Sequence, residues 1–180
     1  MAEQNAFKLL DSIRQKSVEL NNESVDYSSQ STSIKNIAYI VNGLHFFCDA
    51  VDIKEVSTCE NLTVIPQTKR WMRGIINSKG VLYSVTDLSL FAGFDRKIQE
   101  NRGHLLLLSN ADKQSALLVN RVVGFRYFDE QHKLEELEVN EELPEGLSSF
   151  VNEAYQVEGE TWYRLDIENL LDSAQFGEVQ

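Results

Sequence analysis

The segment WMRGIINSKGVLYSVTDL, residues 71–88, carries the most informative fold signal of this chain. Its apolar residues fall into two short runs, which are separated by the dipeptide Lys79-Gly80. Two such runs around a glycine-containing turn predict two antiparallel strands that contribute to the core of a sheet. The segment carries no recognisable catalytic residue, so it predicts a structural element and not an active site.

The rest of the chain repeats this pattern of short strands. The dipeptide Asn42-Gly43 separates two apolar runs, which predicts another tight hairpin, and a late hairpin is expected to turn at Glu158-Gly159-Glu160. A further strand and loop are predicted at 55–65, and further strands at 104–109, 115–122 and 123–129. Many short strands without long alternating helices predict a mainly β fold, a sandwich or a barrel, and not a doubly wound parallel sheet.

The two ends of the chain have a different pattern. Residues 1–20 are expected to form a helix, because a few apolar residues recur at helical spacing, namely Ala6, Leu9, Leu10, Ile13 and Leu20. Residues 21–33 are polar and serine-rich, which is typical of a linker. A short closing helix is expected at 167–176. We therefore expect an N-terminal helix with its linker at 1–33, followed by one domain at 34–175.

The charge of the chain excludes some classes of partner. The net charge of −11 and the pI near 4.7 argue against nucleic acid, because phosphate binding needs a surplus of Lys and Arg. No apolar run approaches the roughly 20 residues that cross a bilayer, so membrane insertion is not expected. The first residues lack the pattern of a secretory signal, so we expect a cytoplasmic protein in which Cys48 and Cys59 are reduced core residues.

Catalytic and cofactor motifs are missing from the sequence. The three histidines, His45, His104 and His132, lack metal-ligand spacing, and no nucleotide-binding motif is present, so no cofactor is expected. The eight carboxylates between Asp129 and Glu145 are expected to form a solvated acidic segment. A small hydrolase that pairs Cys48 or Cys59 with His45 stays open as an alternative, although no local feature supports it.

One local charge contrast points to an interface. Residues 61–86 contain four cations and no acid, and the cations are Lys69, Arg70, Arg73 and Lys79. This basic patch on an apolar double strand suits either a solvated sheet edge or a surface that docks a partner rich in carboxylates.

Several segments together resemble the CheW family of chemotaxis coupling proteins. The stretch VIPQTKRWMRGIINSKGVLYSVTDLSLFAGF, residues 64–94, is similar to the family pattern of an apolar-basic-glycine step, N-x-[RK]-G and V-x-D-L. The family's preceding, later and closing segments are matched by FFCDAVDIKEV, ALLVNRVVGFRYF and WYRLDIENLLDS. The resemblance covers residues 34–175, and FKLLDSIRQKSVELNN at 7–22 is similar to the PilI-type branch, which serves type IV pili and twitching motility.

The resemblance implies a fold of two small five-stranded SH3-like barrels and a function without catalysis. The function would be an adaptor that couples a methyl-accepting chemoreceptor to a CheA-type histidine kinase, in twitching motility or, as the alternative, in flagellar chemotaxis. The partner-binding residues implied are Ile53, Glu55, Arg73, Gly74, Ile75, Asn77, Lys79 and Gly80.

The resemblance also implies a role for each kind of residue in that set. Arg73 and Lys79 would be charges at the rim of the site, while Ile53 and Ile75 would make apolar contacts. We expect Ile53, Glu55, Ile75, Asn77 and Lys79 to lie near one another on the surface. At least one of the glycines Gly74 and Gly80 should have a backbone conformation that disfavours a side chain.

Overall fold

The computed structural model describes residues 35–110, 112–135 and 143–177 of the chain. By its internal contacts the chain divides into Met1–Thr32 and Ser33–Gln180, and the second unit contains all of the described residues. The helix predicted for residues 1–20 and the linker at 21–33 lie outside them.

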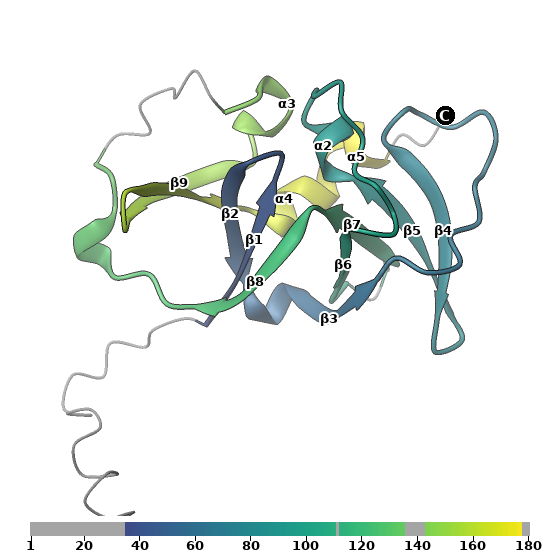
Figure 1. Ribbon diagram of the computed structural model, residues 1–180, viewed down its shortest axis with the longest axis horizontal. Coiled ribbons are helices and arrows are strands. Elements are labelled where there is room, and N and C mark those ends of the chain that lie inside the picture. The colour runs from purple at the N-terminus through teal and green to yellow at the C-terminus, as the bar shows by residue number, and fades with distance from the viewer. Residues whose placement is uncertain (1–34, 111, 136–142, 178–180) are drawn as a thin grey trace, which may run out of the picture. The chain divides into compact units, whose positions relative to one another are not determined.

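Ten strands of the described residues form two five-stranded sheets (Figure 1). The first sheet has the order β8 (Arg121–Arg126), β1 (Asn36–Val41), β2 (Leu44–Asp49), β10 (Glu160–Leu165), β9 (Val151–Val157). The second sheet has the order β3 (Ile53–Thr58), β6 (His104–Leu108), β7 (Ser115–Val119), β5 (Val81–Asp87), β4 (Met72–Ser78). The predicted mainly β fold with two five-stranded units is therefore confirmed.

Short helices join and cover the sheets. They are η1 (Ala50–Asp52), α2 (Leu88–Phe91), η2 (Glu130–His132), α3 (Glu145–Ser148), α4 (Ile167–Asp172) and α5 (Ala174–Gly177). The single closing helix predicted at 167–176 is divided at Ser173, whose backbone is extended and whose hydroxyl oxygen accepts a hydrogen bond from the amide of Phe176. No helix in the described part of the chain is long and apolar enough to cross a membrane.

Three hairpins turn at the X-Gly dipeptides that mark them in the sequence. In each case the residue before the glycine has a φ of 53° to 55° and the glycine also has a positive φ, as a two-residue type I′ turn requires. The pairs are Asn42-Gly43, Lys79-Gly80 and Glu158-Gly159. The turns fix the register, so residues next to each turn, such as Ser78 and Val81, pair across the hairpin.

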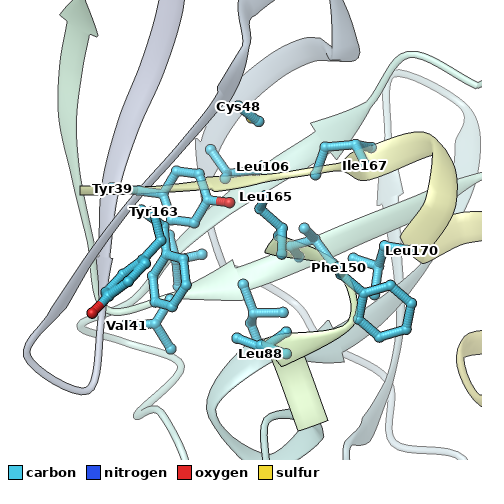
Figure 2. Close-up of a cluster of buried hydrophobic side chains, with 14 of the residues drawn as sticks. Tyr39, Val41, Cys48, Leu88, Leu106, Phe150, Tyr163, Leu165, Ile167 and Leu170 are labelled. Atoms are coloured by element: carbon cyan, nitrogen blue, oxygen red, sulfur yellow. The ribbon is translucent and has the colours of Figure 1, made fainter. Parts of the chain in front are cut away.

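The main core lies where the two sheets and the helices meet, and Figure 2 shows its side chains converging. The first sheet contributes Tyr39, Val41 and Tyr163, while Leu106 comes from the second sheet and Leu88 from α2. Each sheet also has a smaller cluster of its own. Ala38, Phe47, Tyr155 and Trp162 form the one on the first sheet. The shared core holds the two sheets together, so surfaces on both are presented by one packed body.

The predicted strands at 115–122 and 123–129 differ slightly from the observed ones. β7 ends at Val119 and β8 begins at Arg121, so the chain passes from the second sheet to the first at Asn120. The side-chain oxygen of Asn120 accepts a hydrogen bond from the amide of Asn42 at 2.7 Å, and its own amide donates to the carbonyl of Ile40 at 3.0 Å. These bonds tie the crossover to the first hairpin.

Candidate partner-binding site

The hairpin of β4 and β5 forms one edge of the second sheet and has two different faces. Ile76 and Tyr83 pair across the hairpin and are buried in the second sheet's own cluster. Because side chains alternate along a strand, the neighbouring residues face the other way. That outer face carries Ile75, Asn77 and Leu82, and Leu82 is 57% exposed.

An ion pair joins this hairpin to the strand at the opposite edge of the same sheet. The Nζ of Lys79, at the tip of the hairpin, lies 2.6 Å from Oε2 of Glu55 on β3. A second bond between β3 and the hairpin runs from Nζ of Lys54 to the hydroxyl of Tyr83 on β5, at 3.0 Å. The two contacts join β3 to the hairpin, and Lys79 stays 78% exposed in side-chain area.

The other predicted site residues of this region are placed around that ion pair. The side-chain oxygen of Asn77 accepts the amide of Gly80 at 2.9 Å, and this bond steadies the turn. Ile75 exchanges backbone hydrogen bonds with Thr63, while half-buried Ile53 packs against the shared core. Direct contact is thus shown for Glu55 with Lys79 and for Asn77 with Gly80. A single binding surface that includes Ile53 and Ile75 stays a prediction.

Arg73 is not a charge at the rim of the site, so that expectation is wrong. Its side chain is 11% exposed, and its guanidinium group lies 3.0 Å from the carboxylate of Asp87, which is fully buried. The same group donates to the carbonyl of Ile98 at 3.1 Å and pairs with Glu100. A buried arginine with carboxylate partners supports the fold, since leaving either charge unpaired would be costly.

The two glycines of the predicted site differ in what they require. Gly74 has a φ of +137°, and a Cβ placed on it would lie 2.1 Å from the backbone oxygen of Thr63. Gly80 has a φ of +86° in the turn, but open space surrounds it. The prediction that at least one of them disfavours a side chain is confirmed, and Gly74 is the stronger case.

The thiols are poorly placed for nucleophilic attack. Cys48 is fully buried in the shared core, and Cys59 is buried in the second sheet's own cluster. Burial raises the pKa of each thiol above its ordinary value, which disfavours the reactive thiolate. The ring centres of His45 and Trp162 lie 4.7 Å apart, and Nδ1 of His45 lies 3.5 Å from a carboxylate oxygen of Glu160. Among the described residues no cluster of His, Cys, Asp and Glu could hold a metal ion.

A second exposed surface was not identified as a site from the sequence. Val123, Phe125 and Tyr127 point outward along β8 and its end, and we call them the β8 strip. Phe125 is 58% and Tyr127 is 60% exposed, and the ammonium group of Lys35 lies 3.5 Å from the centre of the Phe125 ring. The signal was available in the sequence, because large apolar residues at every second position of a strand lie on one face.

Comparison with known proteins agrees with the observed fold. The CheW-like domain model matches residues 37–175. Protein PilI of Pseudomonas aeruginosa is 26% identical over 96 residues, which are 53% of this chain and 54% of that protein, so the chain spans about half the length of this relative. The crystal structure of scaffolding protein TtCheW from Thermoanaerobacter tengcongensis matches the fold with a TM-score of 0.66 and 19% identity, over 79% of this chain and 95% of that one. The chain belongs to the CheW-like domain family.

Proposed function

We propose that the protein is a non-catalytic cytoplasmic adaptor that couples a chemoreceptor-type protein to a CheA-type histidine kinase. The observation that carries this proposal is that large apolar side chains are exposed on both sheets. Leu82 lies on the second sheet, Phe125 lies on the first, and Tyr127 directly follows strand β8 of the first. Exposed apolar patches mark sites of protein association, and an adaptor needs two of them on one rigid body.

The receptor would bind at the hairpin face, which we define as Ile75, Asn77, Lys79 and Leu82 with Glu55 opposite. This face combines an exposed apolar residue with a surface ion pair. Protein interfaces have the same composition, with apolar residues at the centre and polar residues at the rim. Gly74 and Gly80 would shape its backbone, and Ile53 would add apolar contact at its border. Arg73 would act on this face indirectly, by holding β4 in place.

Reversing one charge of this face should weaken receptor binding without unfolding the protein. Lys79→Glu removes an exposed ion pair, which contributes at most about 1 kcal/mol to stability, so the melting temperature should change little. It also puts two carboxylates together on the binding surface, and we expect the affinity for the receptor's cytoplasmic tip to fall at least about tenfold. Titration calorimetry with a soluble receptor fragment measures this.

A double variant in which Lys79 and Glu55 exchange their charges separates two explanations of that loss. In Lys79→Glu with Glu55→Lys the ion pair is restored, but each charge stands on the opposite strand. Recovery of binding would mean that the pair acts by joining β3 to the hairpin. Continued loss would mean that the receptor reads the individual charges. Binding of Lys79→Glu at the parental affinity would contradict the assignment of this face.

The kinase would bind at the β8 strip. Replacing Phe125 and Tyr127 with serine should leave the unfolding transition nearly unchanged, because both side chains are exposed. Capture of the kinase's regulatory domain should fall at least about tenfold, since buried aromatic residues dominate the affinity of interfaces. Val64→Ser is the control, because Val64 is an apolar residue outside the strip and is 71% exposed. A loss of receptor binding with intact kinase capture would reverse the assignment of the two faces.

The finer assignment to type IV pili is supported by the likeness to Protein PilI. On this proposal, deleting the coding sequence in its host abolishes twitching and leaves flagellar swimming intact. Loss of swimming with normal twitching would instead favour the flagellar alternative. An ester-hydrolysing activity that disappears on replacement of Cys48 or Cys59 would contradict the adaptor proposal and support the hydrolase.

A further inference from the structure

The loop between α2 and β6 carries three cations that are left without a carboxylate partner among the described residues. Residues 95–102, which we call the basic loop, contain Arg96, Lys97 and Arg102, and all three are exposed. The acids of the same loop are already paired, Asp95 with Arg70 at 3.1 Å and Glu100 with Arg73. In a chain with a net charge of −11, this leaves a local surplus of positive charge.

The basic loop is held in place by buried polar groups. The carboxylate of Asp87 accepts the amide of Ile98 at 2.9 Å, and Arg73 donates to the carbonyl of the same residue at 3.1 Å. The hydroxyl of Ser89 donates to the carbonyl of Arg96 at 2.7 Å. Both backbone groups of Ile98 are therefore bonded to a buried ion pair, and the flanking cations extend from a fixed backbone. A fixed backbone lowers the entropy that binding must overcome.

A hollow lies beside the basic loop. Its volume is about 790 Å³, and its walls are the basic loop on one side and the β1–β2 turn with Asn120 on the other. The side-chain oxygen of Asn120 accepts a hydrogen bond from the backbone amide of Asn42, which leaves the NH₂ group of Asn120 to donate to a ligand. Arg96, Lys97 and Arg102 also offer only hydrogen-bond donors. Asp95 also lines the hollow, but its carboxylate is paired with Arg70, so the three cations are in excess and the hollow is suited to a ligand that supplies negatively charged acceptors.

We infer that this hollow binds a carboxylate-rich segment of a partner protein. Nucleic acid would need a longer basic track, and its many phosphates would be repelled by a chain that carries −11 overall. The same repulsion opposes an extended anionic membrane. A few carboxylates on a short peptide match three cations around a hollow of this size. This surface is distinct from the hairpin face and the β8 strip, so it adds a third contact to the proposed adaptor.

Fluorescence anisotropy with a labelled octaglutamate peptide and the full chain tests the inference. We expect binding that weakens as salt is raised, and no comparable binding of octaglutamine. Arg96→Gln, Lys97→Gln and Arg102→Gln together should weaken octaglutamate binding at least about tenfold. The control carries Lys35→Gln, Lys54→Gln and Lys113→Gln, which remove the same charge outside the hollow and should change octaglutamate binding less than twofold. Because Lys54 bonds Tyr83 and Lys113 pairs with Asp172, urea denaturation first checks that this variant is folded.

The outcomes decide between distinct explanations. Equal losses in the two triple variants would show that only net charge matters and would overturn the site. Tighter binding of single-stranded DNA or of vesicles with anionic lipid, lost with the same three loop cations, would overturn the choice of a protein partner. Unchanged kinase and receptor capture by the loop variant would leave the proposed adaptor function standing whichever result is obtained.

Discussion

Gly74→Ala is expected to lower the free energy of unfolding by about 3 kcal/mol. The added Cβ would lie 2.1 Å from the carbonyl oxygen of Thr63 and 2.8 Å from its carbonyl carbon, and φ is +137°. Thr63 cannot move away cheaply, because it exchanges two backbone hydrogen bonds of 2.9 Å with Ile75. Urea denaturation followed by circular dichroism measures the change as a lower midpoint with an unchanged slope.

Gly80→Ala is the control for positive φ without a clash. Open space surrounds Gly80, so its φ of +86° should cost about 1 kcal/mol and no more. A Gly74→Ala protein that is no less stable than Gly80→Ala would show that the segment before β4 can move aside. Thr63 would then not fix the outer edge of the sheet.

The features that could be predicted from the sequence are those encoded by neighbouring residues. Asn42-Gly43 and Lys79-Gly80 each marked a tight hairpin, because the φ angles of such a turn depend on the residues that form it. The late hairpin was predicted to turn at Glu158-Gly159-Glu160, but Glu160 already pairs with Val157, so the turn is Glu158-Gly159 alone. The apolar runs on either side then fixed which strands pair. The hairpins predicted only a sandwich or a barrel, and the two five-stranded units were implied by the family resemblance.

The role of Arg73 could not be predicted in this way. A basic residue beside exposed positions of a hairpin has the pattern of a surface charge, and its partners stand far along the chain. Asp87 is 14 positions away, Ile98 is 25 and Glu100 is 27. Only the folded chain brings these groups together, so burial of the arginine is a property of tertiary structure.

The candidate site also contains both residues whose position could be predicted from the sequence and residues whose position could not. Glu55 and Lys79 were expected to be close because the family resemblance placed both segments on one side, and the structure places them 2.6 Å apart. The β8 strip and the basic loop were missed, because exposure depends on which face of a strand or loop the rest of the fold covers. Phe125, for example, lies in a segment that was recognised only as a strand.

Asp87→Asn is expected to lower the free energy of unfolding by about 3 kcal/mol. Asp87 has no exposed side-chain area, and its two carboxylate oxygens accept four hydrogen bonds. Oδ1 accepts from the amides of Ser89 and Leu90 at 3.0 and 3.2 Å, which caps α2. Oδ2 accepts from Ile98 and Arg73 at 2.9 and 3.0 Å. The NH₂ group of asparagine would face a hydrogen-bond donor where the carboxylate accepted one, and the buried Arg73 would keep only Glu100 as a charge partner.

Asp166→Asn is the matched control, because Asp166 also caps a helix but accepts only the amide of Asn169, at 2.9 Å, in a half-buried position. Asparagine and aspartate are similar caps, so this change should cost less than about 0.5 kcal/mol in urea denaturation. A double variant with Arg73→Leu and Asp87→Asn should be more stable than the sum of the single changes predicts, since Arg73→Leu alone leaves the buried charge of Asp87 without its ion-pair partner and the double change does not. If Asp87→Asn is no less stable than Asp166→Asn, then the ion pair with Arg73 does not hold β4, and the basic loop must be fixed by other contacts.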